Sequence, residues 1–452
     1  MFKGISELPP GNSMVVENGS CRIWPYWTLD YSSIDVDMTE EDCAGQLLDL
    51  LSDATRIRLR SDVPVGAYLS GGLDSSVITA LIKEHTRKPL KTFSVTFDDP
   101  EFDESTYQRD VIELLGTDND SVRCSYTDIC DVFPDVIWHT EKPILRTAPA
   151  PLYLLSRLVR DDGFKVVLTG EGSDEFLGGY DIFKEAKIRR FWAVNLASRY
   201  RPLLLKRLYP YLGNLQAQSD SYLKAFFHVK PSDVSNPFFS HLPRWELTAK
   251  LKTFLSEDTK REIGIAGAHA DLKHLLPEDF DEWDGLSQAQ YLEATVLLPG
   301  YILSSQGDRM AMANSVEGRY PFLDHRVIEF ACKIPPKLKM RALNEKYILK
   351  RAAGHLIPAS VKARPKQPYR APDARSFFDA ATRRARSEYL DVLLSSESLR
   401  KGGLFNPLAV AKLAEKARKG QVIGTKDNMA LVGIVSTQLF VDQFINHLGR
   451  LG

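Results

Sequence analysis

Apolar residues between Val63 and Ile82 change from the pattern of a strand to the pattern of a helix. The stretch reads VPVGAYLSGGLDSSVITALI, in which an apolar run of strand length leads into Gly71 and Gly72. An apolar pattern of helical period begins at Ser75. The two glycines therefore lie where a strand ends and a helix begins. The pattern predicts the first strand and helix of an α/β core.

Further patterns extend this core along the chain. The run KTFSVTFDD at 91–99 predicts a second strand, and we expect the α/β core to occupy about 63–180. Residues 182–281 are rich in aromatic, basic and leucine residues without glycine loops, which favours helices over the core. A long helical pattern at 290–356 is broken by a charged loop, and helices are expected again after 376.

The N-terminal part predicts a hairpin and then a helix. The stretch MVVENGSCRI contains two β-prone runs joined around Asn18 and Gly19. A lone hairpin is only marginally stable in water, and the remaining chain has no long all-β segment that could supply a sheet for it. After the hairpin, Thr39 is expected to cap a helix whose apolar face includes Leu47 and Leu51.

Composition and charge narrow the class of protein. The chain has 452 residues, enough for about two to three domains. Its 58 basic and 59 acidic residues give a net charge of −1, so we expect neither nucleic acid nor a membrane surface as a partner. The five cysteines show no C-x-x-C spacing, which favours reduced thiols in a cytoplasmic protein. No apolar run approaches the roughly 20 residues of a membrane span, and the apolar stretch 429–448 is expected to be buried.

The glycine loop has the features of a phosphate site. Glycines let the backbone approach an anion, and the helix that follows points its first N–H groups and its dipole toward it. Asp74 suggests Mg²⁺ held against a pyrophosphate. No Walker lysine follows, so transfer of a γ-phosphate is not indicated. A glycine turn without a ligand is the alternative, which the complete SGGLDSS motif disfavours. The candidate phosphate ligands are Ser70, Gly71, Gly72, Asp74, Ser75 and Ser76.

A second glycine loop carries a group of carboxylates. Residues 165–180 read KVVLTGEGSDEFLGGY, a short apolar run that ends in an acidic loop. Ligands of open α/β sheets bind outside the carboxyl ends of the strands, so this loop and the first could face one pocket. Glu171, Asp174 and Glu175 could supply a metal ligand and an acid–base group. Taken alone, the cluster is also typical of a solvated acidic turn.

A third stretch, GDRMAMANSVEGRYPFLD at 307–324, is densely charged. Charges that alternate with small and apolar residues are costly to bury unless they pair with each other or with a ligand. The pattern fits both an active-site segment and a structural ion-pair network. The charged residues are Asp308, Arg309, Glu317, Arg319 and Asp324.

Together the three stretches resemble the synthetase domain of the asparagine synthetase family, whose nucleotide loop is of the PP-loop ATP pyrophosphatase type. SGGLDSS, GEGSDE with GGY, and DR…MA…S.E.R.PFLD stand in the family's order, and the stretches 347–350 and 364–367 also match. The resemblance covers about residue 60 to the C-terminus. It implies a parallel-sheet PP-loop core, of the adenine nucleotide α-hydrolase-like type, with extra helices.

The resemblance also implies a reaction and roles for residues. Such enzymes adenylate the side-chain carboxylate of aspartate with MgATP, release pyrophosphate, and let ammonia displace AMP to give asparagine. Asp74 and Asp174 are implied to serve Mg²⁺ and pyrophosphate, while Glu171 assists the ammonia step. Lys366 is implied to stabilise the charge of the adenylation transition state. Val95, Thr169 and Gly170 are implied to contact the nucleotide, and a homodimer is plausible.

The chain departs from the family at its N-terminus. Glutamine-dependent members begin with a glutaminase domain whose N-terminal cysteine is the nucleophile, whereas this chain begins Met1-Phe2-Lys3. We expect the hairpin to be the tail of such an Ntn-type domain, with ammonia drawn from glutamine in a longer form. Lys142 and Ala311 are smaller departures. The expected divisions are a remnant at 1–31 and a synthetase domain at 39–452, comprising a nucleotide core (60–181), a helical region (182–290), active-site helices and loops (291–372) and C-terminal helices (376–452).

Other functions remain open on the sequence. Relatives with this fold close β-lactam rings or cyclise peptides with the same adenylation and an internal amine. PP-loop enzymes that activate tRNA bases for thiolation are disfavoured by the neutral charge and by the lack of a catalytic cysteine pair. A binding protein without catalysis is disfavoured because all three loops are intact.

Overall fold

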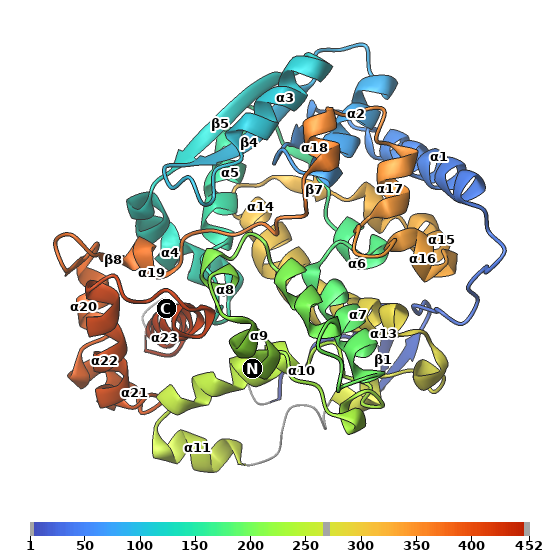
Figure 1. Ribbon diagram of the computed structural model, residues 1–452. Coiled ribbons are helices and arrows are strands. Elements are labelled where there is room, and N and C mark those ends of the chain that lie inside the picture. The colour runs from blue at the N-terminus through green and yellow to red at the C-terminus, as the bar shows by residue number, and fades with distance from the viewer. Residues whose placement is uncertain (1–3, 265–271, 447–452) are drawn as a thin grey trace.

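The computed structural model describes residues 4–264 and 272–446, and its centre is a five-stranded parallel sheet (Figure 1). The strand order is β5-β4-β3-β6-β7, so the chain starts in the middle of the sheet and builds outward in both directions. The predicted parallel PP-loop α/β core is confirmed. The strands are β3 (Val65–Tyr68), β4 (Lys91–Phe97), β5 (Asp118–Cys124), β6 (Val166–Leu168) and β7 (Glu317–Arg319).

The register of the central strands places the two glycine loops side by side. Strand β3 pairs with β6 through Val65 with Val166 and Ala67 with Leu168. Both strands therefore end at the same level, and the loops that follow them leave the same edge of the sheet. This is the point where the strand order reverses, which is where open α/β sheets bind ligands.

Strand β7 was not predicted, because its three residues lie inside the charged stretch 307–324, whose pattern indicates a loop. Glu317 pairs in parallel with Val166, and Arg319 pairs with Leu168. A strand of three residues in a polar sequence gives almost no periodic signal. The strand β5 is similarly polar (DNDSVRC) and is recognisable only from its pairing with β4 along seven residues.

Helices cover both faces of the sheet and form two hydrophobic cores. One core packs α1, α2, α15 and α17 under one face, and the other packs α4, α5, α14, α19 and α23 on the opposite face. Because both faces are covered, Ala67, Phe93 and Val167 are fully buried. These helices are α1 (Glu40–Arg58), α2 (Leu73–His85), α4 (Tyr126–Thr140), α5 (Pro149–Asp161), α14 (Arg309–Ala313), α15 (His325–Lys333), α17 (Tyr347–Ala352), α19 (Ala374–Phe377) and α23 (Thr425–Phe440).

The region after the core is helical, as its composition indicated. It begins with α7 (Asp181–Ala193) and leads to α13 (Gly285–Leu292) and the π-helix η6 (Glu293–Asp308). Most of the remaining helices are short, and several of them add residues to the two cores. They are α3 (Ser105–Leu115), α6 (Ser173–Leu177), η1 (Arg201–Arg207), α8 (Gly213–Gln216), α9 (Asp220–Phe226), η2 (Pro231–Asp233), α10 (Leu242–Ala249), η3 (Lys250–Phe254), α11 (Glu257–Ile263), η4 (Lys273–Leu275), η5 (Phe280–Glu282), η7 (Pro321–Leu323), α16 (Pro336–Lys339), α18 (Ala359–Ala363), α20 (Glu388–Leu393), α21 (Ser396–Gly402), α22 (Pro407–Arg418) and η8 (Val441–Asn446), with a small hairpin of β8 (Phe378–Asp379) and β9 (Arg384–Ala385).

The C-terminal helix passes the length and composition test for a membrane span. Thr425–Asn446 is 22 residues long, so the expectation that no segment reaches this length was wrong. Of its most apolar stretch, 61% is buried inside the protein, as in the core helix of a soluble protein. Val432 and Val435 are completely inaccessible, which agrees with the predicted burial of this stretch.

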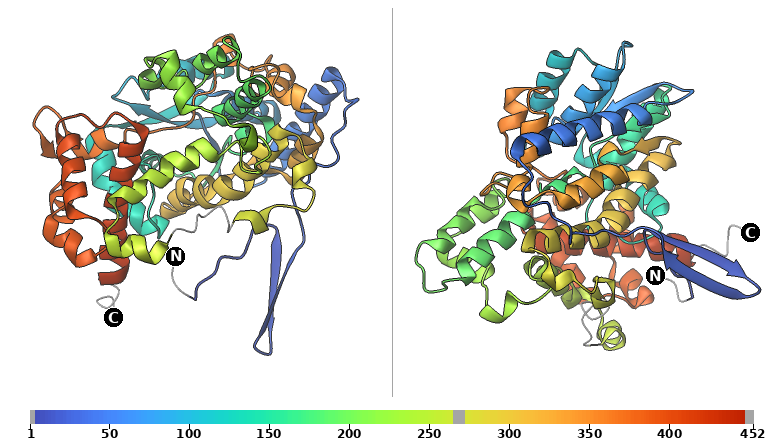
Figure 2. Two further views of the ribbon diagram at one scale, coloured as in Figure 1. Left: turned by 60° about the horizontal axis from the view of Figure 1, so that its bottom comes forward. Right: turned by 90° about the vertical axis from the view of Figure 1, so that its right-hand side faces the viewer.

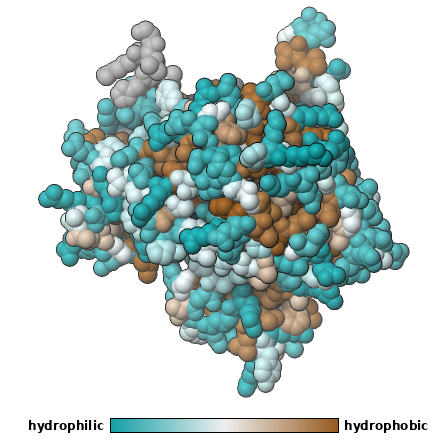
Figure 3. Space-filling view, turned by 90° about the horizontal axis from the view of Figure 1, so that it is seen from above, coloured by the Kyte–Doolittle hydropathy of each residue, from teal (hydrophilic) through white to brown (hydrophobic). Residues whose placement is uncertain are grey.

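The predicted N-terminal hairpin is present and projects from the body (Figure 2). Strands β1 (Asn12–Glu17) and β2 (Ser20–Pro25) pair around Asn18 and Gly19, which both have positive φ, as a tight hairpin turn requires. Met14, Val16 and Ile23 are exposed, and the arm at the upper right of Figure 3 carries hydrophobic residues away from the body. The predicted helix cap is confirmed too, because Thr39 Oγ1 accepts from Asp42 N at 3.1 Å.

Candidate active site

The first loop is shaped by its glycines and serines. Gly71 has φ +75°, and a Cβ there would lie 2.8 Å from Gln108 N, so no other residue fits without a shift. Ser75 Oγ accepts from Ser70 N at 3.2 Å, and Ser76 Oγ donates to the Gly72 carbonyl at 2.7 Å. The hydroxyls of Ser75 and Ser76 thus hold the turn from β3 into α2. The N-terminus of α2 remains directed at the space beyond the sheet, which suits an anion.

The second loop packs directly against the first. A Cβ on Gly170 would lie 2.9 Å from both Asp74 Cβ and Ser75 N, so only glycine allows the two loops to touch. Ser173, which follows in the second loop, donates from Oγ to Asp74 Oδ1 at 2.8 Å. The contact that the strand register predicts is therefore made by side chains as well as backbone.

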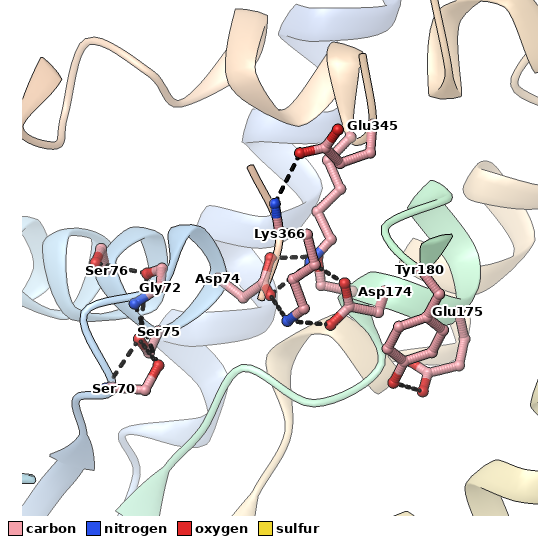
Figure 4. Close-up of polar contacts among 12 residues, drawn as sticks. Ser70, Gly72, Asp74, Ser75, Ser76, Asp174, Glu175, Tyr180, Glu345 and Lys366 are labelled. Carbon is pink, nitrogen blue, oxygen red and sulfur yellow. Dashed lines mark hydrogen bonds and ion pairs between the residues drawn. The ribbon is translucent and has the colours of Figure 1, made fainter. Parts of the chain in front are cut away.

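Two aspartates and two lysines form a buried cluster where the loops meet (Figure 4). Lys346 Nζ lies 2.5 Å from Asp74 Oδ2 and 2.6 Å from Asp174 Oδ1. Lys366 Nζ lies 2.6 Å from Asp174 Oδ2 and 3.5 Å from Asp74 Oδ2. Burial raises the pKa of Asp74, but the two ammonium groups outweigh burial and hold the pKa below its usual value. Burial lowers the pKa of Lys366, but the two aspartates raise it well above its ordinary value.

Lys346 is the residue of this cluster that the sequence did not reveal. Its side chain is 1% exposed, and its backbone has φ +49° at the start of α17. The resemblance to the family includes only the basic stretch that follows Lys346, at 347–350. Lysine is almost never fully buried unless it is paired, so its partners identify it, and these lie more than 170 residues away in the sequence.

The acidic residues of the second loop differ in their ionisation. Burial raises the pKa of Glu171 to about 7, and its Oε2 atom is inaccessible and has no hydrogen-bond partner among the described residues. Burial, followed by the charge of Asp174, raises the pKa of Glu175 to about 8, and Tyr180 donates to its Oε1 at 2.7 Å. Only Asp174 is paired with cations. The loop therefore contains a carboxylate that could bind a metal, Asp174, and a group that can exchange a proton near neutral pH, Glu171. Its third acid, Glu175, is protonated at that pH.

A cavity of about 1330 Å³ opens over these loops. Most of the predicted site residues line it: Ser70, Gly72, Asp74, Ser75, Val95, Thr169, Gly170, Glu171, Asp174 and Lys366. Gly71 and Ser76 do not line it, and Ser76 is fully buried behind the loop. The Val95 carbonyl accepts from Gln108 Nε2 at 2.9 Å, so this oxygen is already engaged.

The charged residues of the third stretch do not line the cavity and have their partners outside it. Asp324 accepts from Arg58 Nη1 at 2.8 Å and from Arg326 Nε at 3.0 Å, and these bonds hold its pKa below its usual range although burial opposes them. Arg319 Nη1 donates to two backbone carbonyls at the end of α1, and Tyr320 donates to Asp308 at 2.6 Å. The structural ion-pair interpretation therefore holds for these residues.

The residues present fit a nucleotide with Mg²⁺. Magnesium in nucleotide sites is bound by one or two carboxylates together with the phosphates of the substrate. Asp74 and Asp174 supply two carboxylates beside a helix N-terminus, although the described residues contain no group of three or more His, Cys, Asp or Glu placed to hold a metal. Thr169 lines the same cavity, and its Oγ1 atom is buried without a hydrogen-bond partner among the described residues.

Comparisons with known proteins match a family and several relatives. A profile described as asparagine synthase matches residues 46–442. The chain is 30% identical over 402 residues to amidase chry2 of Gibberella zeae, covering 82% of this chain and 59% of that protein. It is 30% identical to amidase chyE of Penicillium rubens (92% and 65% covered) and 28% identical to asparagine synthetase [glutamine-hydrolyzing] 1 of Bacillus subtilis (80% and 55%). The chain thus spans between about half and two thirds of the length of these relatives.

Proposed function

The chain belongs to the asparagine synthase family, and we propose that it is an AMP-forming ligase that makes an amide from a carboxylic acid, ATP and ammonia. The observation that carries this proposal is the cluster of Asp74, Asp174, Lys346 and Lys366 beside the glycine loop, with Glu171 on the same cavity wall. Following the family, we propose aspartate as the acceptor, a β-aspartyl-adenylate as the intermediate and asparagine as the product.

In the first half-reaction, a carboxylate oxygen of the acceptor attacks the α-phosphorus of ATP and the bond to pyrophosphate breaks. This step brings two anions together, so cations and N–H donors must neutralise the developing charge. We assign this role to the N-terminus of α2 and to Lys366, which lies 2.6 Å from Asp174. Asp74 and Asp174 would hold Mg²⁺, which supplies charge neutralisation on the phosphates when it is bound.

In the second half-reaction, the nitrogen of ammonia attacks the acyl carbon and AMP leaves. The attacking nitrogen must lose a proton. Glu171 has a pKa of about 7, a value that allows a carboxylate to accept a proton near neutral pH. We propose that the carboxylate of Glu171, which lines the cavity, takes this proton and returns it to solvent.

We further propose that ammonia comes from glutamine in a longer form of the protein, and that the β1–β2 hairpin belongs to its glutaminase domain. The exposed apolar residues of the hairpin support this, because a two-stranded sheet is marginally stable alone. The buried free thiols of Cys43, Cys124, Cys130 and Cys332 support a reducing, cytoplasmic location.

Acceptors other than aspartate form the second candidate function, as in a β-lactam synthetase or a peptide cyclase. Two of the relatives are named amidases and not asparagine synthetases. The cavity also exceeds the roughly 300–1000 Å³ that ordinary ligand sites occupy. An enzyme with an internal amine would form its amide without added ammonium, and this distinguishes the two functions.

Exchange of labelled pyrophosphate into ATP tests the proposal. We expect exchange that depends on the acceptor, and we expect Asp74→Asn and Asp174→Asn to abolish it. Asp118→Asn is a matched control, because Asp118 also pairs with a lysine at 3.1 Å but lies outside the cavity. Exchange at the rate of the unmodified protein in either site variant would refute the proposed site.

A further inference from the structure

The segment that carries Lys366 makes almost no hydrogen bonds through its backbone. Residues 365–371 lie between α18 and α19 and form neither helix nor strand. Pro365 and Pro368 have no backbone N–H, so Lys366 and Gln367 are the only backbone donors of the stretch 365–368. Among the described residues, the backbone of 365–371 takes part in one hydrogen bond, from Lys366 N. The position of the Lys366 backbone therefore depends on the acceptor of this bond.

The acceptor is Glu345, which directly precedes the other lysine of the aspartate–lysine cluster. Glu345 Oε1 accepts from Lys366 N at 2.9 Å (Figure 4). The next residue in the chain, Lys346, has its Nζ within 2.6 Å of both Asp74 and Asp174. One glutamate is thus hydrogen-bonded to the segment of one lysine and covalently attached to the other. A shift of Glu345 would displace both ammonium groups relative to the aspartates.

Glu345 is itself held by two further lysines. Its Oε2 atom lies 2.9 Å from Lys184 Nζ, and its Oε1 atom lies 3.3 Å from Lys350 Nζ. Lys184 is fixed in turn by Asp181, at 3.0 Å, at the start of α7. Burial raises the pKa of Glu345, but the two lysines outweigh burial and hold the pKa below its usual value. The carboxylate is therefore ionised and fixed, and a charged acceptor makes a stronger hydrogen bond with an N–H group than a neutral one.

The bond to the Lys366 backbone is made in addition to these ion pairs. Lys184 already has a second carboxylate partner, and Lys350 Nζ also donates to Asn344 Oδ1 at 3.0 Å. Glu345 and Lys366 are 21 residues apart, so their bond is a tertiary contact and not part of a helix or a turn. Neutralising Lys184 and Lys350 does not require this contact, whereas fixing the Lys366 segment does.

We propose that Glu345 is a positioning residue for adenylation, whose bond to the Lys366 N–H holds the Lys366 ammonium where the transition-state charge develops. This proposal rests on the adenylation reaction proposed above. Glu345 needs no contact with a substrate for this role. Misplacement of a catalytic group by about 1 Å can cost about 100-fold in rate. Loss of this bond should therefore slow pyrophosphate exchange without removing the ATP site.

Three variants separate the hydrogen bond of Glu345 from its charge. Glu345→Ala removes both and should lower kcat for acceptor-dependent pyrophosphate exchange roughly 10- to 100-fold, with KM for ATP changed little. Glu345→Gln loses the charge but keeps an oxygen that can accept from Lys366 N–H, so its kcat should stay closer to that of the unmodified protein. Asp181→Asn is the matched control, because Asp181 is the other buried carboxylate on Lys184 but accepts from Tyr209 N instead of Lys366 N. It should leave kcat close to that of the unmodified protein.

Hydrogen exchange of backbone amides tests the same bond in the unmodified protein, and mass spectrometry with fragmentation to single residues measures it. Because of the two prolines, the stretch 365–368 reports only the amides of Lys366 and Gln367. We expect the Lys366 amide to exchange slowly and the Gln367 amide, which has no partner among the described residues, to exchange fast. Glu345→Ala should abolish the protection of the Lys366 amide, whereas Glu345→Gln should keep most of it.

Four results would overturn the proposal. Equally fast hydrogen exchange of the Lys366 and Gln367 amides in the unmodified protein would show that the bond does not hold the segment, whether or not the variants fold. Equal losses of kcat in Glu345→Ala and Glu345→Gln, or in Asp181→Asn, would assign Glu345 to charge balance. A rise in KM for ATP in Glu345→Ala at unchanged kcat would make Glu345 a nucleotide residue.

The fourth result is the absence of pyrophosphate exchange with every carboxylic acid in the unmodified protein. It would refute adenylation itself, and this proposal with it. Protection of the Lys366 amide does not depend on the reaction, so failure of the proposed function and failure of the hydrogen bond are distinguishable.

Discussion

Glu175 provides a test of how burial sets the charge state of the candidate site. Its side chain is 1% exposed, Tyr180 donates to Oε1, and Oε2 has no partner among the described residues. Burial and the nearby Asp174 raise its pKa from 4.5 to about 8. Glu175 therefore holds its proton at neutral pH. Glu175→Gln replaces a protonated acid by a neutral side chain of the same shape.

The expected size of the effect follows from the pKa. The folded state holds the proton of Glu175 more tightly than the unfolded state does. Protonated Glu175 therefore contributes its full stabilisation below pH 4.5, and this contribution is lost as the pH rises through about 8. Each pH unit between these values corresponds to about 1.4 kcal/mol. Between pH 5 and pH 7 the free energy of unfolding of the unmodified protein should fall by about 2 to 3 kcal/mol relative to Glu175→Gln.

Urea unfolding of both proteins at pH 5, 6 and 7 measures this difference. We expect the free energy of unfolding of Glu175→Gln to rise steadily relative to that of the unmodified protein from pH 5 to pH 7. The variant should also keep acceptor-dependent pyrophosphate exchange. Glu113→Gln, on the exposed side of α3, should follow the unmodified protein at every pH. A difference between Glu175→Gln and the unmodified protein that does not change with pH would show that Glu175 does not take up a proton on folding, and the argument from burial would fail.

The other predictions concern the two half-reactions and the nitrogen source. Lys346→Met should destabilise the protein by about 3 to 5 kcal/mol in urea unfolding and abolish pyrophosphate exchange, because two buried carboxylates are left with one ammonium group; a variant of unchanged stability would refute the pairing. Lys366→Met should slow pyrophosphate exchange itself, whereas Glu171→Gln should slow amide formation more than exchange, and equal losses in Glu171→Gln would make Glu171 a nucleotide or metal residue. At saturating ammonia, amide formation should rise with pH through about 7 as Glu171 loses its proton, and Glu171→Gln should lack this rise. A preparation that starts at Met1 should form amide from ammonium and hydrolyse no glutamine; amide formed from glutamine at a comparable rate would contradict the assignment of the hairpin.

Much of the fold and the loops was predictable because their signals are local. The switch from strand to helix at Gly71 and Gly72 is visible in the order of apolar residues, and the turn at Asn18 has a two-residue signature. The adjacency of the two loops followed from a rule about parallel sheets, and the pairing of β3 with β6 agrees with it. Each of these features depends on a few neighbouring residues.

The unpredicted features depend on residues that are distant in the sequence. The three residues of β7 form a strand only because they pair with the edge strand β6. Of the charged residues around them, Asp324 accepts from Arg58, and Arg319 donates to the backbone at the end of α1. Lys346 is buried only because Asp74 and Asp174 neutralise it. Neither a lysine nor a short polar run indicates from its local sequence that a distant residue will pair with it.

Charge balance connects these features to the proposed chemistry. In the cluster the two aspartates balance Lys346 and Lys366, and Glu175 stays neutral because a further negative charge beside Asp174 would be buried without a cation. Because the charges of the cluster are paired, its net charge is close to zero. The cluster therefore adds little net attraction for an anionic acceptor. A cluster whose charges are balanced in this way is suited to a site where further charge would arrive with the nucleotide and its Mg²⁺.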